Sequence, residues 1–188
     1  MTRKADEANR TQLLEKIVAY TLANGVGSLS LRPLAKNIGV SPAALLYHFR
    51  SKEELTVEIL RHAGEAQREL FASLQLRAGE TPRDLCREVW RILAAPESRP
   101  LFRLFFEVYG LALIDPTRFP GFFPAAVWNW ITFLERTSVR NGVDIDTARA
   151  LATVVLAGFR GFLLDLCATG EDERVGRGVA VWIEMLPG

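Results

Sequence analysis

The sequence predicts an all-α protein of about nine helices, and three observations support this prediction. Apolar residues recur at the three- and four-residue spacings of a helix along nearly the whole chain. Glycines, prolines and Asn-Gly pairs divide the chain into segments of helical length. No stretch of useful length alternates apolar and polar residues as a half-buried strand does, and no internal repeat is present.

Three helices are expected near the N-terminus. Residues 9–24 have an apolar stripe of helical period and end at an Asn-Gly pair, which indicates a stop. A short helix over residues 31–38 follows Ser30, a good N-cap residue, and ends at Gly39. The next helix, residues 42–49, begins with a Ser-Pro pair, because a proline at the first helical position loses no hydrogen bond.

Six further helices follow from the same start and stop signals. They are expected at about residues 52–76, 82–95, 96–113, 124–140, 144–168 and 172–186. Residues 115–124 contain three prolines and a glycine and therefore predict a loop.

The composition is that of a globular protein with a substantial core. Of the 188 residues, 49% are hydrophobic and 24% are charged, whereas a disordered chain has far fewer apolar residues. The first residues are charged, and no run approaches the roughly 18 apolar residues of a membrane span, so we expect a cytoplasmic protein. Cys86 and Cys167 show no metal-ligand spacing, so we expect reduced thiols and neither a metal nor a cofactor.

The net charge of +1 hides an asymmetry between two parts of the chain. Residues 1–54 have eight basic and five acidic side chains, including all four lysines, whereas residues 55–188 have 15 basic and 17 acidic ones. A locally basic module favours a polyanionic partner. We therefore predict two domains, a small basic head over residues 1–54 and a larger body over residues 55–188.

The spacing of Ala35, Gly39 and Leu45 meets three steric demands of a helix-turn-helix. The alanine is small where the two helices cross, and the glycine permits the positive φ of a tight turn. Leu45 and Phe49, four residues apart, face inward and pin the second helix to the core. The outward face then contains alanine, leucine and tyrosine, which a purely solvated helix does not need.

The segment LRPLAKNIGVSPAALLYHFRSKEEL resembles the DNA-binding head of the TetR family of regulators, closely so from Leu13 to about Leu55. The resemblance implies that the helix from Ser41 to Phe49 enters the major groove and that Lys52 meets a phosphate. The family pattern Gly-x-Leu-Tyr is Ala-Ala-Leu-Leu here, and an aromatic residue follows one step later as Tyr47. The phosphate contact of the family tyrosine is therefore not assigned to a residue of this chain.

The expected DNA contacts divide into base readout and phosphate positioning. Alanine methyls and the Tyr47 ring are able to contact thymine methyls or sugars, while lysine, arginine and serine side chains meet phosphates. His48 is either a DNA contact or a half-buried histidine bonded locally. The predicted DNA-binding residues are Ser30, Arg32, Ser41, Pro42, Ala43, Ala44, Tyr47, His48 and Lys52.

A helix-turn-helix monomer covers one half-site, so a symmetric pair is expected to bind a palindrome. Apolar stripes on the last two helices, with Gly158 and Gly161 allowing close approach, predict a four-helix dimer interface; the alternative is an intramolecular core. The predicted interface residues are Leu151, Val155, Gly158, Phe162, Leu166, Val175, Val179 and Trp182.

Between the head and this interface the sequence is rich in large aromatic residues. Some must form the core, but rings around a few polar groups also describe an apolar ligand cavity. Asn129 and Asp165 are further polar candidates, and Arg160 with Asp165, or Arg103 with Glu107, could instead form structural ion pairs. The predicted ligand contacts are Phe102, Arg103, Phe106, Glu107, Tyr109, Trp128, Phe133 and Arg160.

These observations predict a ligand-responsive DNA-binding regulator, a repressor released from a palindromic operator when a small hydrophobic or aromatic effector binds the body. The alternative is a helical carrier or partner-binding protein with a non-functional head. An enzyme is not expected, because the two histidines, His48 and His62, lie near no nucleophile motif or paired Cys-His arrangement.

Overall fold

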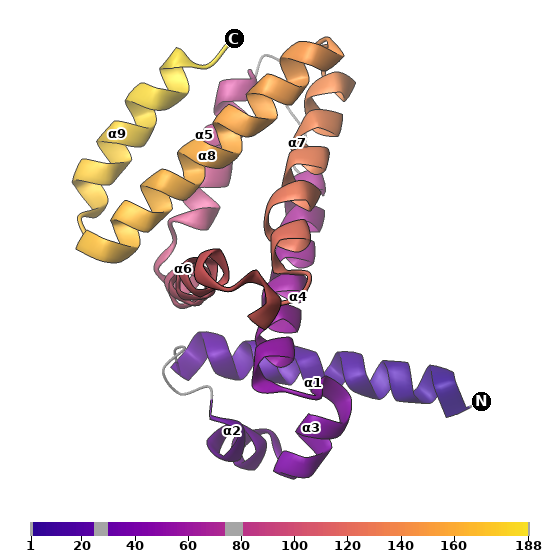
Figure 1. The fold of residues 1–188 in the computed structure, drawn as a ribbon. Coiled ribbons are helices and arrows are strands. Elements are labelled where there is room, and N and C mark those ends of the chain that lie inside the picture. Colours follow the sequence, from indigo (N-terminus) through magenta and orange to yellow (C-terminus); the bar gives the residue numbers. More distant parts are fainter. Residues whose placement is uncertain (1, 25–29, 74–80, 188) are drawn as a thin grey trace.

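The computed structural model describes residues 2–24, 30–73 and 81–187, and all regular structure in these ranges is helical (Figure 1). This confirms the all-α prediction. The α-helices of the described ranges are α1 (Thr2–Asn24), α2 (Leu31–Ile38), α3 (Pro42–Phe49), α4 (Lys52–Ser73), α5 (Pro82–Leu93), α6 (Arg99–Ile114), α7 (Asn129–Arg140), α8 (Ile145–Thr169) and α9 (Asp172–Met185). Two short 3-10 helices, η2 (Pro96–Ser98) and η3 (Pro116–Arg118), and a π-helix, η4 (Pro124–Trp128), lie between them.

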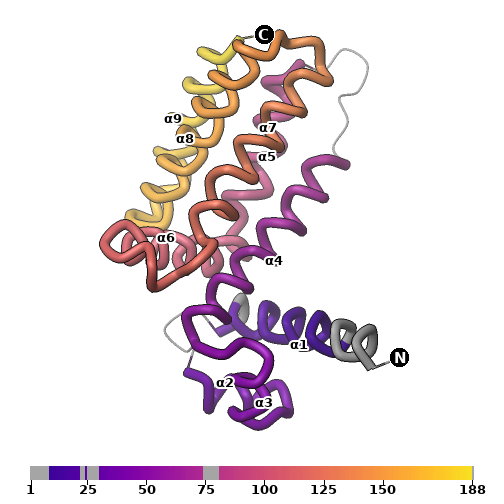
Figure 2. The backbone as a smooth tube through the Cα atoms, turned by 45° about the vertical axis from the view of Figure 1, so that its right-hand side comes forward, coloured from indigo at the N-terminus to yellow at the C-terminus, as the bar shows by residue number. Residues whose placement is uncertain are grey.

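The helices form a head and a body that α4 connects. Helices α1, α2 and α3 lie together at one end, and α4 runs from this head into the body (Figure 1). Helix α6 crosses between the two parts, and the neighbouring helices α8 and α9 run antiparallel along the body, as Figure 2 also shows. The C-terminus lies at the end of the body farthest from the head.

Most helix boundaries agree with the start and stop signals in the sequence. Gly39 ends α2 with φ of 77°, and its N–H donates to the carbonyl of Ala35. The side chain of Ser41 caps α3 by accepting from the N–H of Ala44 at 3.1 Å. Asp144 caps α8 in the same way through the N–H of Thr147.

The starts of two helices differ from the prediction. Helix α1 begins at Thr2, seven residues earlier than expected, because its charged first turns are compatible with a helix although they have no apolar stripe. The expected end of α4 near residue 76 and the Gly25 stop lie outside the described residues. The helix expected from residue 124 begins as the π-helix η4, with α7 following directly.

The largest core cluster joins the head to the body. It contains residues of α1, α2 and α3 together with Leu104, Val108 and Ala112 of α6 and Phe122. Helix α6 also contacts α1 directly. The predicted division at residue 54 remains a prediction, and the buried core continues across it.

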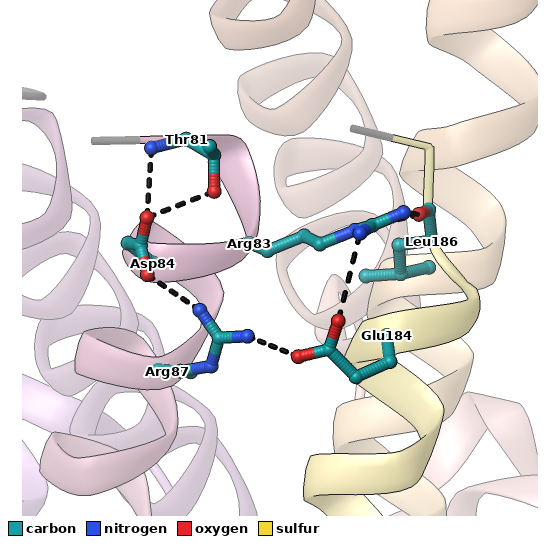
Figure 3. Close-up of polar contacts among 6 residues, drawn as sticks. All are labelled: Thr81, Arg83, Asp84, Arg87, Glu184 and Leu186. Atoms are coloured by element: carbon teal, nitrogen blue, oxygen red, sulfur yellow. Dashed lines mark hydrogen bonds and ion pairs between the residues drawn. The ribbon is translucent and has the colours of Figure 1, made fainter. Parts of the chain in front are cut away.

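Charged side chains tie α9 to α5 at the far end of the body (Figure 3). The guanidinium of Arg83 donates to the carbonyl of Leu186 at 2.9 and 2.6 Å. Arg87 bridges Asp84 on its own helix and Glu184 on α9. These contacts hold the C-terminal helix against the chain's own body.

Among the described residues, α8 alone is long and apolar enough, by length and composition, to cross a membrane. Only 22% of its most apolar window is buried within the chain. A helix that packs on the chain's own core with one side and on a protein partner with the other side is as apolar as a membrane-spanning helix.

Candidate nucleic-acid interface and ligand cavity

The three residues that predicted the helix-turn-helix are placed as expected. Ala35 and Leu45 are fully buried in the head core, and Gly39 adopts the left-handed conformation between the helices. Phe49 is 1% exposed, and the guanidinium of Arg10 from α1 lies 5.2 Å from its ring centroid. These contacts orient α3 on the head.

The opposite face of α3 is open to solvent. Tyr47 is 77% exposed, and Pro42, Ala43 and Leu46 are exposed on the same helix. Ala44 is half-buried. An exposed tyrosine and an exposed leucine on a short helix form a surface that could lie against the edges and sugars of bases.

His48 is half-buried and contacts its two aromatic neighbours. Its ring centroid lies 5.2 Å from that of Tyr47 and 6.3 Å from that of Phe49. In the described ranges no hydrogen bond to the His48 ring occurs, so its two nitrogens remain available. His48 is thus half-buried as one interpretation expected, but without the local hydrogen bond of that interpretation, and its contact with DNA stays a prediction.

The phosphate-positioning candidates lie exposed around α3. Ser30, Arg32, Ser41 and Lys52 are all exposed. Helix α4 begins at Lys52, where the side chain of Ser51 accepts from the N–H of Glu54 at 3.0 Å. The positive ends of α3 and α4, together with Lys52, give this end of the head groups that attract phosphate oxygens.

An ion-pair network attaches α1 to α4. Arg10 donates to the Glu58 carboxylate at 2.9 Å, and Arg61 donates to the same carboxylate at 3.0 Å. Burial raises the pKa of Glu58, but the hydrogen bonds and charges of Arg61 and Arg10 outweigh that effect and lower the pKa overall. The ionised carboxylate therefore links the head to the connecting helix at neutral pH.

The body contains a mainly apolar cavity of about 150 Å³. Its wall comes from α4, α5, α6, α7 and α8, with Phe122 and residues of η4 closing one side. Three of the predicted ligand contacts, Phe102, Phe133 and Arg160, line it. An engineered cavity of similar volume binds benzene, so the space is enough for one aromatic ring.

Five predicted ligand contacts lie away from the cavity. Trp128 is 65% exposed, and Arg103 and Glu107 are exposed on the outer face of α6. Phe106 and Tyr109 pack among other rings of the core instead. None of these five residues lines the cavity, although the sequence predicted them as ligand contacts.

The π-helix explains the position of Trp128. A π-helical turn contains an extra residue, so it shifts the phase of the side chains relative to the preceding and following turns. Trp130 and Phe133 of α7 then line the cavity, while Trp128 points to solvent. A constant helical period cannot anticipate this shift.

The two acid–base pairs considered from the sequence are not formed. Asp165 pairs with Arg174 at 2.7 Å on the surface rather than with Arg160. Asn129 lines a separate groove between α4 and α7. Arg160 instead donates to the carbonyl of Ala126 in η4 and lies over the rings of Phe105 and Tyr109.

Helix α4 contributes cavity residues that the sequence analysis missed. Leu60, Gly64, Gln67 and Phe71 all line the cavity. Their spacing of four, three and four residues places them on one helix face. The sequence contains this spacing, but Gly64 is small and Gln67 is polar, so the four positions do not form an apolar stripe.

Cys86 also lines the cavity, from α5. Burial raises the pKa of its thiol to about 11. The thiol is therefore protonated at neutral pH and is a poor nucleophile and metal ligand.

The predicted dimer residues face largely inward. Leu166, Val175 and Val179 are buried against each other within the chain, and Val155 lines the cavity. Gly158 lies against the Trp182 ring, and Phe162 packs on the same ring with centroids 5.6 Å apart. Leu151 is half-buried. Intramolecular packing thus uses most of the side chains that were expected to meet a partner.

A different apolar face of α8 and α9 is exposed. Its large members are Val154 and Leu164 on α8 and Val181 and Met185 on α9. The small residues Ala157, Gly161 and Ala168 are exposed at the intervening positions of α8. We call these seven residues the outer α8–α9 face.

The sequence comparisons agree with the geometry of the head. Residues 13–59 match the model of the family described as "Bacterial regulatory proteins, tetR family". Over 185 residues the chain is 25% identical to the HTH-type transcriptional regulator BetI of Rhizobium meliloti (strain 1021), covering 96% of this chain and 77% of that protein.

Solved structures with the same fold extend over the body as well. A TetR-family transcriptional regulator from Pectobacterium atrosepticum superposes with a TM-score of 0.76 at 19% identity, covering 99% of this chain and 96% of that chain. The multidrug binding protein EbrR complexed with imidazole gives a TM-score of 0.64 at 23% identity, covering 100% and 95%. At these identities the likeness shows a common fold.

Proposed function

We propose that this chain, which belongs to the TetR family of bacterial regulatory proteins, is a cytoplasmic repressor that leaves a palindromic operator when a small apolar effector enters the body cavity. The helix-turn-helix head binds DNA, and the body provides the effector site and the homodimer interface.

One observation supports the ligand response above all others: α4 reaches both sites without a break. The helix begins at Lys52, beside the recognition helix α3, and its later turns form one wall of the cavity from Val57 to Phe71. A ligand in the cavity contacts this helix directly. A tilt or shift of α4 would therefore move the recognition helix.

A second connection runs through α6 and the shared core. Phe105 and Phe122 line the cavity and also pack against the core cluster that contains α1 and α2 residues. Arg118 pairs with Glu53 of α4 at 3.5 Å next to this core. A ligand that displaces the two phenylalanines would thus move residues of the head even if α4 does not move.

The proposed homodimer uses the outer α8–α9 face. Exposed leucine, valine and methionine beside small residues allow two helix pairs to approach closely and form a four-helix interface. A two-fold pair places two recognition helices at half-sites that must lie about 34–36 Å apart in the major groove. A ligand that favours a different separation weakens operator binding by shifting the population of states.

The DNA-binding part of the proposal is tested by selection from a random pool of duplex DNA. The full-length protein should enrich an inverted repeat whose half-sites are about one helical turn apart. Enrichment of a single half-site would contradict the homodimer. Failure to enrich any sequence would contradict specific regulation.

The ligand response is tested with molecules that co-purify with the protein. Mass spectrometry identifies them after denaturation, and each is then added to the protein bound to its selected DNA. At least one should lower operator affinity about tenfold or more, since allosteric coupling is typically about 1–3 kcal/mol. Ligands that bind without changing operator affinity would contradict the proposed response.

A further inference from the structure

The described residues of the cavity wall carry positive but no negative side-chain charge. Among the described residues that line it, three are arginines and none is aspartate or glutamate. Arg61 is already paired with Glu58 and with Glu65, at 3.0 and 2.6 Å. The other two arginines, Arg68 and Arg160, have no salt bridge to any residue of the described ranges.

Arg160 lines the cavity from α8, beside two aromatic rings. Its guanidinium lies 5.3 Å from the ring centroid of Phe105 and 5.8 Å from that of Tyr109. Within the described residues its single hydrogen bond goes to the carbonyl of Ala126. A guanidinium has five N–H donors, so most of its donor capacity is not used by that bond.

The positive charge of Arg160 is poorly compensated in this position. Burial lowers the pKa of the guanidinium, which means that its charged form has lost favourable hydration. Contacts with ring faces and a neutral carbonyl replace only part of the lost hydration free energy. A carboxylate provides a negative charge and two oxygens that match the guanidinium N–H groups.

Arg68 extends the positive region to the rim of the cavity. Its guanidinium lies 5.3 Å from the Trp130 ring centroid. Both Arg68 and Phe133 line the cavity and also the neighbouring groove between α4 and α7. That groove contains two more arginines, Arg136 and Arg140, and a single acidic residue. A groove of this charge attracts anions toward the cavity.

We propose that the cavity binds an apolar molecule bearing one carboxylate, with the carboxylate paired to Arg160 and the hydrocarbon part lying among the rings. The inference rests on the proposed function only in taking this cavity as the effector site. A cationic ligand is disfavoured, because no described residue of the lining is acidic and arginines already lie over the rings of Phe105 and Trp130 that a cation would use.

Three probes that differ only in their end group test the charge preference. Phenylbutyrate is an anion at neutral pH, phenylbutylamine a cation and phenylbutanol neutral, and each has a phenyl ring with four further carbon atoms. Binding to the full-length protein is measured by isothermal titration calorimetry. The anion should bind at least about tenfold more tightly than either of the others, as expected for a charge-assisted bidentate pair. Equal or tighter binding of the amine or the alcohol would overturn the proposal.

Arginine variants locate the anion. Arg160→Gln should weaken phenylbutyrate about tenfold and change phenylbutanol less than about threefold, while Arg160→Lys should keep part of the preference because it retains the charge. Arg103→Gln is the matched control, since Arg103 is exposed on α6 and does not line the cavity. An anion preference that survives in Arg160→Gln, or is lost in Arg103→Gln, would overturn the assignment to Arg160.

Different experiments test the preference of the cavity for an anion and the release of DNA by a ligand. Calorimetry requires no DNA, so it tests the arginine site even if the protein does not respond on its operator. Conversely, release of the operator by the amine with no response to the acid would support regulation and overturn the carboxylate. Circular dichroism of each variant confirms that a lost preference is not lost folding.

Discussion

Gly158 lies in van der Waals contact with Trp182, so the close approach of α8 and α9 depends on the missing side chain. A Cβ built at this glycine would be 2.2 Å from the nearest ring carbon of Trp182. Gly110 on α6 is also helical, but a Cβ there would meet no atom within 4 Å. The two glycines therefore differ in what they contribute to folding.

Gly158→Ala should lower the free energy of unfolding by about 1–3 kcal/mol, because the indole must move within a packed core. Gly110→Ala, the control, should leave it unchanged or raise it by up to about 1 kcal/mol through helix propensity. Urea unfolding at one protein concentration measures both. Equal effects of the two substitutions would show that Trp182 does not pack on Gly158 as described.

Tyr47 is the side chain on the recognition helix with the most exposed surface and the least role in the head's own packing. Tyr47→Ala should weaken operator binding about tenfold or more, since one base contact is worth about 1–3 kcal/mol. Tyr47→Phe keeps the ring and removes the hydroxyl, so it distinguishes their contributions to operator affinity. Fluorescence polarisation gives the affinities, and thermal unfolding should be the same for all three proteins. Unchanged operator affinity in Tyr47→Ala would remove this residue from the recognition surface.

At the scale of single residues, local steric rules predicted the head better than the body. Ala35, Gly39 and Leu45 each satisfy a demand set by neighbours close in the chain. Arg160 and Trp128 are placed by contacts with distant helices and by the π-helical turn. Tertiary contacts decide which side chains face the cavity. Of the ligand contacts predicted from the sequence, only Arg160, Phe102 and Phe133 therefore line it.

At the scale of elements, α8 has two apolar sides with different uses. One side packs on α7 and α9 within the chain, and the other is exposed as part of the outer α8–α9 face. The sequence showed that the helix is apolar on both sides. It could not indicate which side meets the chain's own core, because the competing surfaces have similar hydrophobicity.

Leu164→Arg should convert the proposed dimer to a monomer without unfolding the chain. Leu164 is 51% exposed within the chain, so an arginine is tolerated there, but in a dimer interface it would bury an unpaired charge. Val139→Arg is the control, because Val139 is 41% exposed on α7, outside the outer α8–α9 face. Sedimentation velocity measures the masses. A dimer that persists in Leu164→Arg would contradict the proposed interface.

At the scale of the whole molecule, the basic head is joined to a nearly neutral body through a shared core and an ion-pair network. Glu58 stands at this junction with Arg10 and Arg61. Its pKa is lowered in the folded chain, so its contribution to stability is present at neutral pH and is lost as the pH falls below its ordinary value of 4.5.

Glu58→Gln should therefore lower the free energy of unfolding at pH 7 by about 1 kcal/mol, the scale of a partly buried charged hydrogen bond. The difference from the unsubstituted protein should shrink as the pH falls below 4.5, where protonation abolishes the carboxylate in both. Glu65→Gln, at the more exposed end of the same network, should cost less. A Glu58→Gln difference that is constant across this pH range would show that the carboxylate charge does not link head and body.

The head is expected to recognise a specific DNA sequence. The most direct measurement is fluorescence polarisation of the full-length protein with DNA flanking its own gene and with random DNA, over a series of salt concentrations. The flanking DNA should bind at least about a thousandfold more tightly than random DNA at moderate salt, and both affinities should fall as salt rises. Equal affinity for the two DNAs at moderate salt would contradict it.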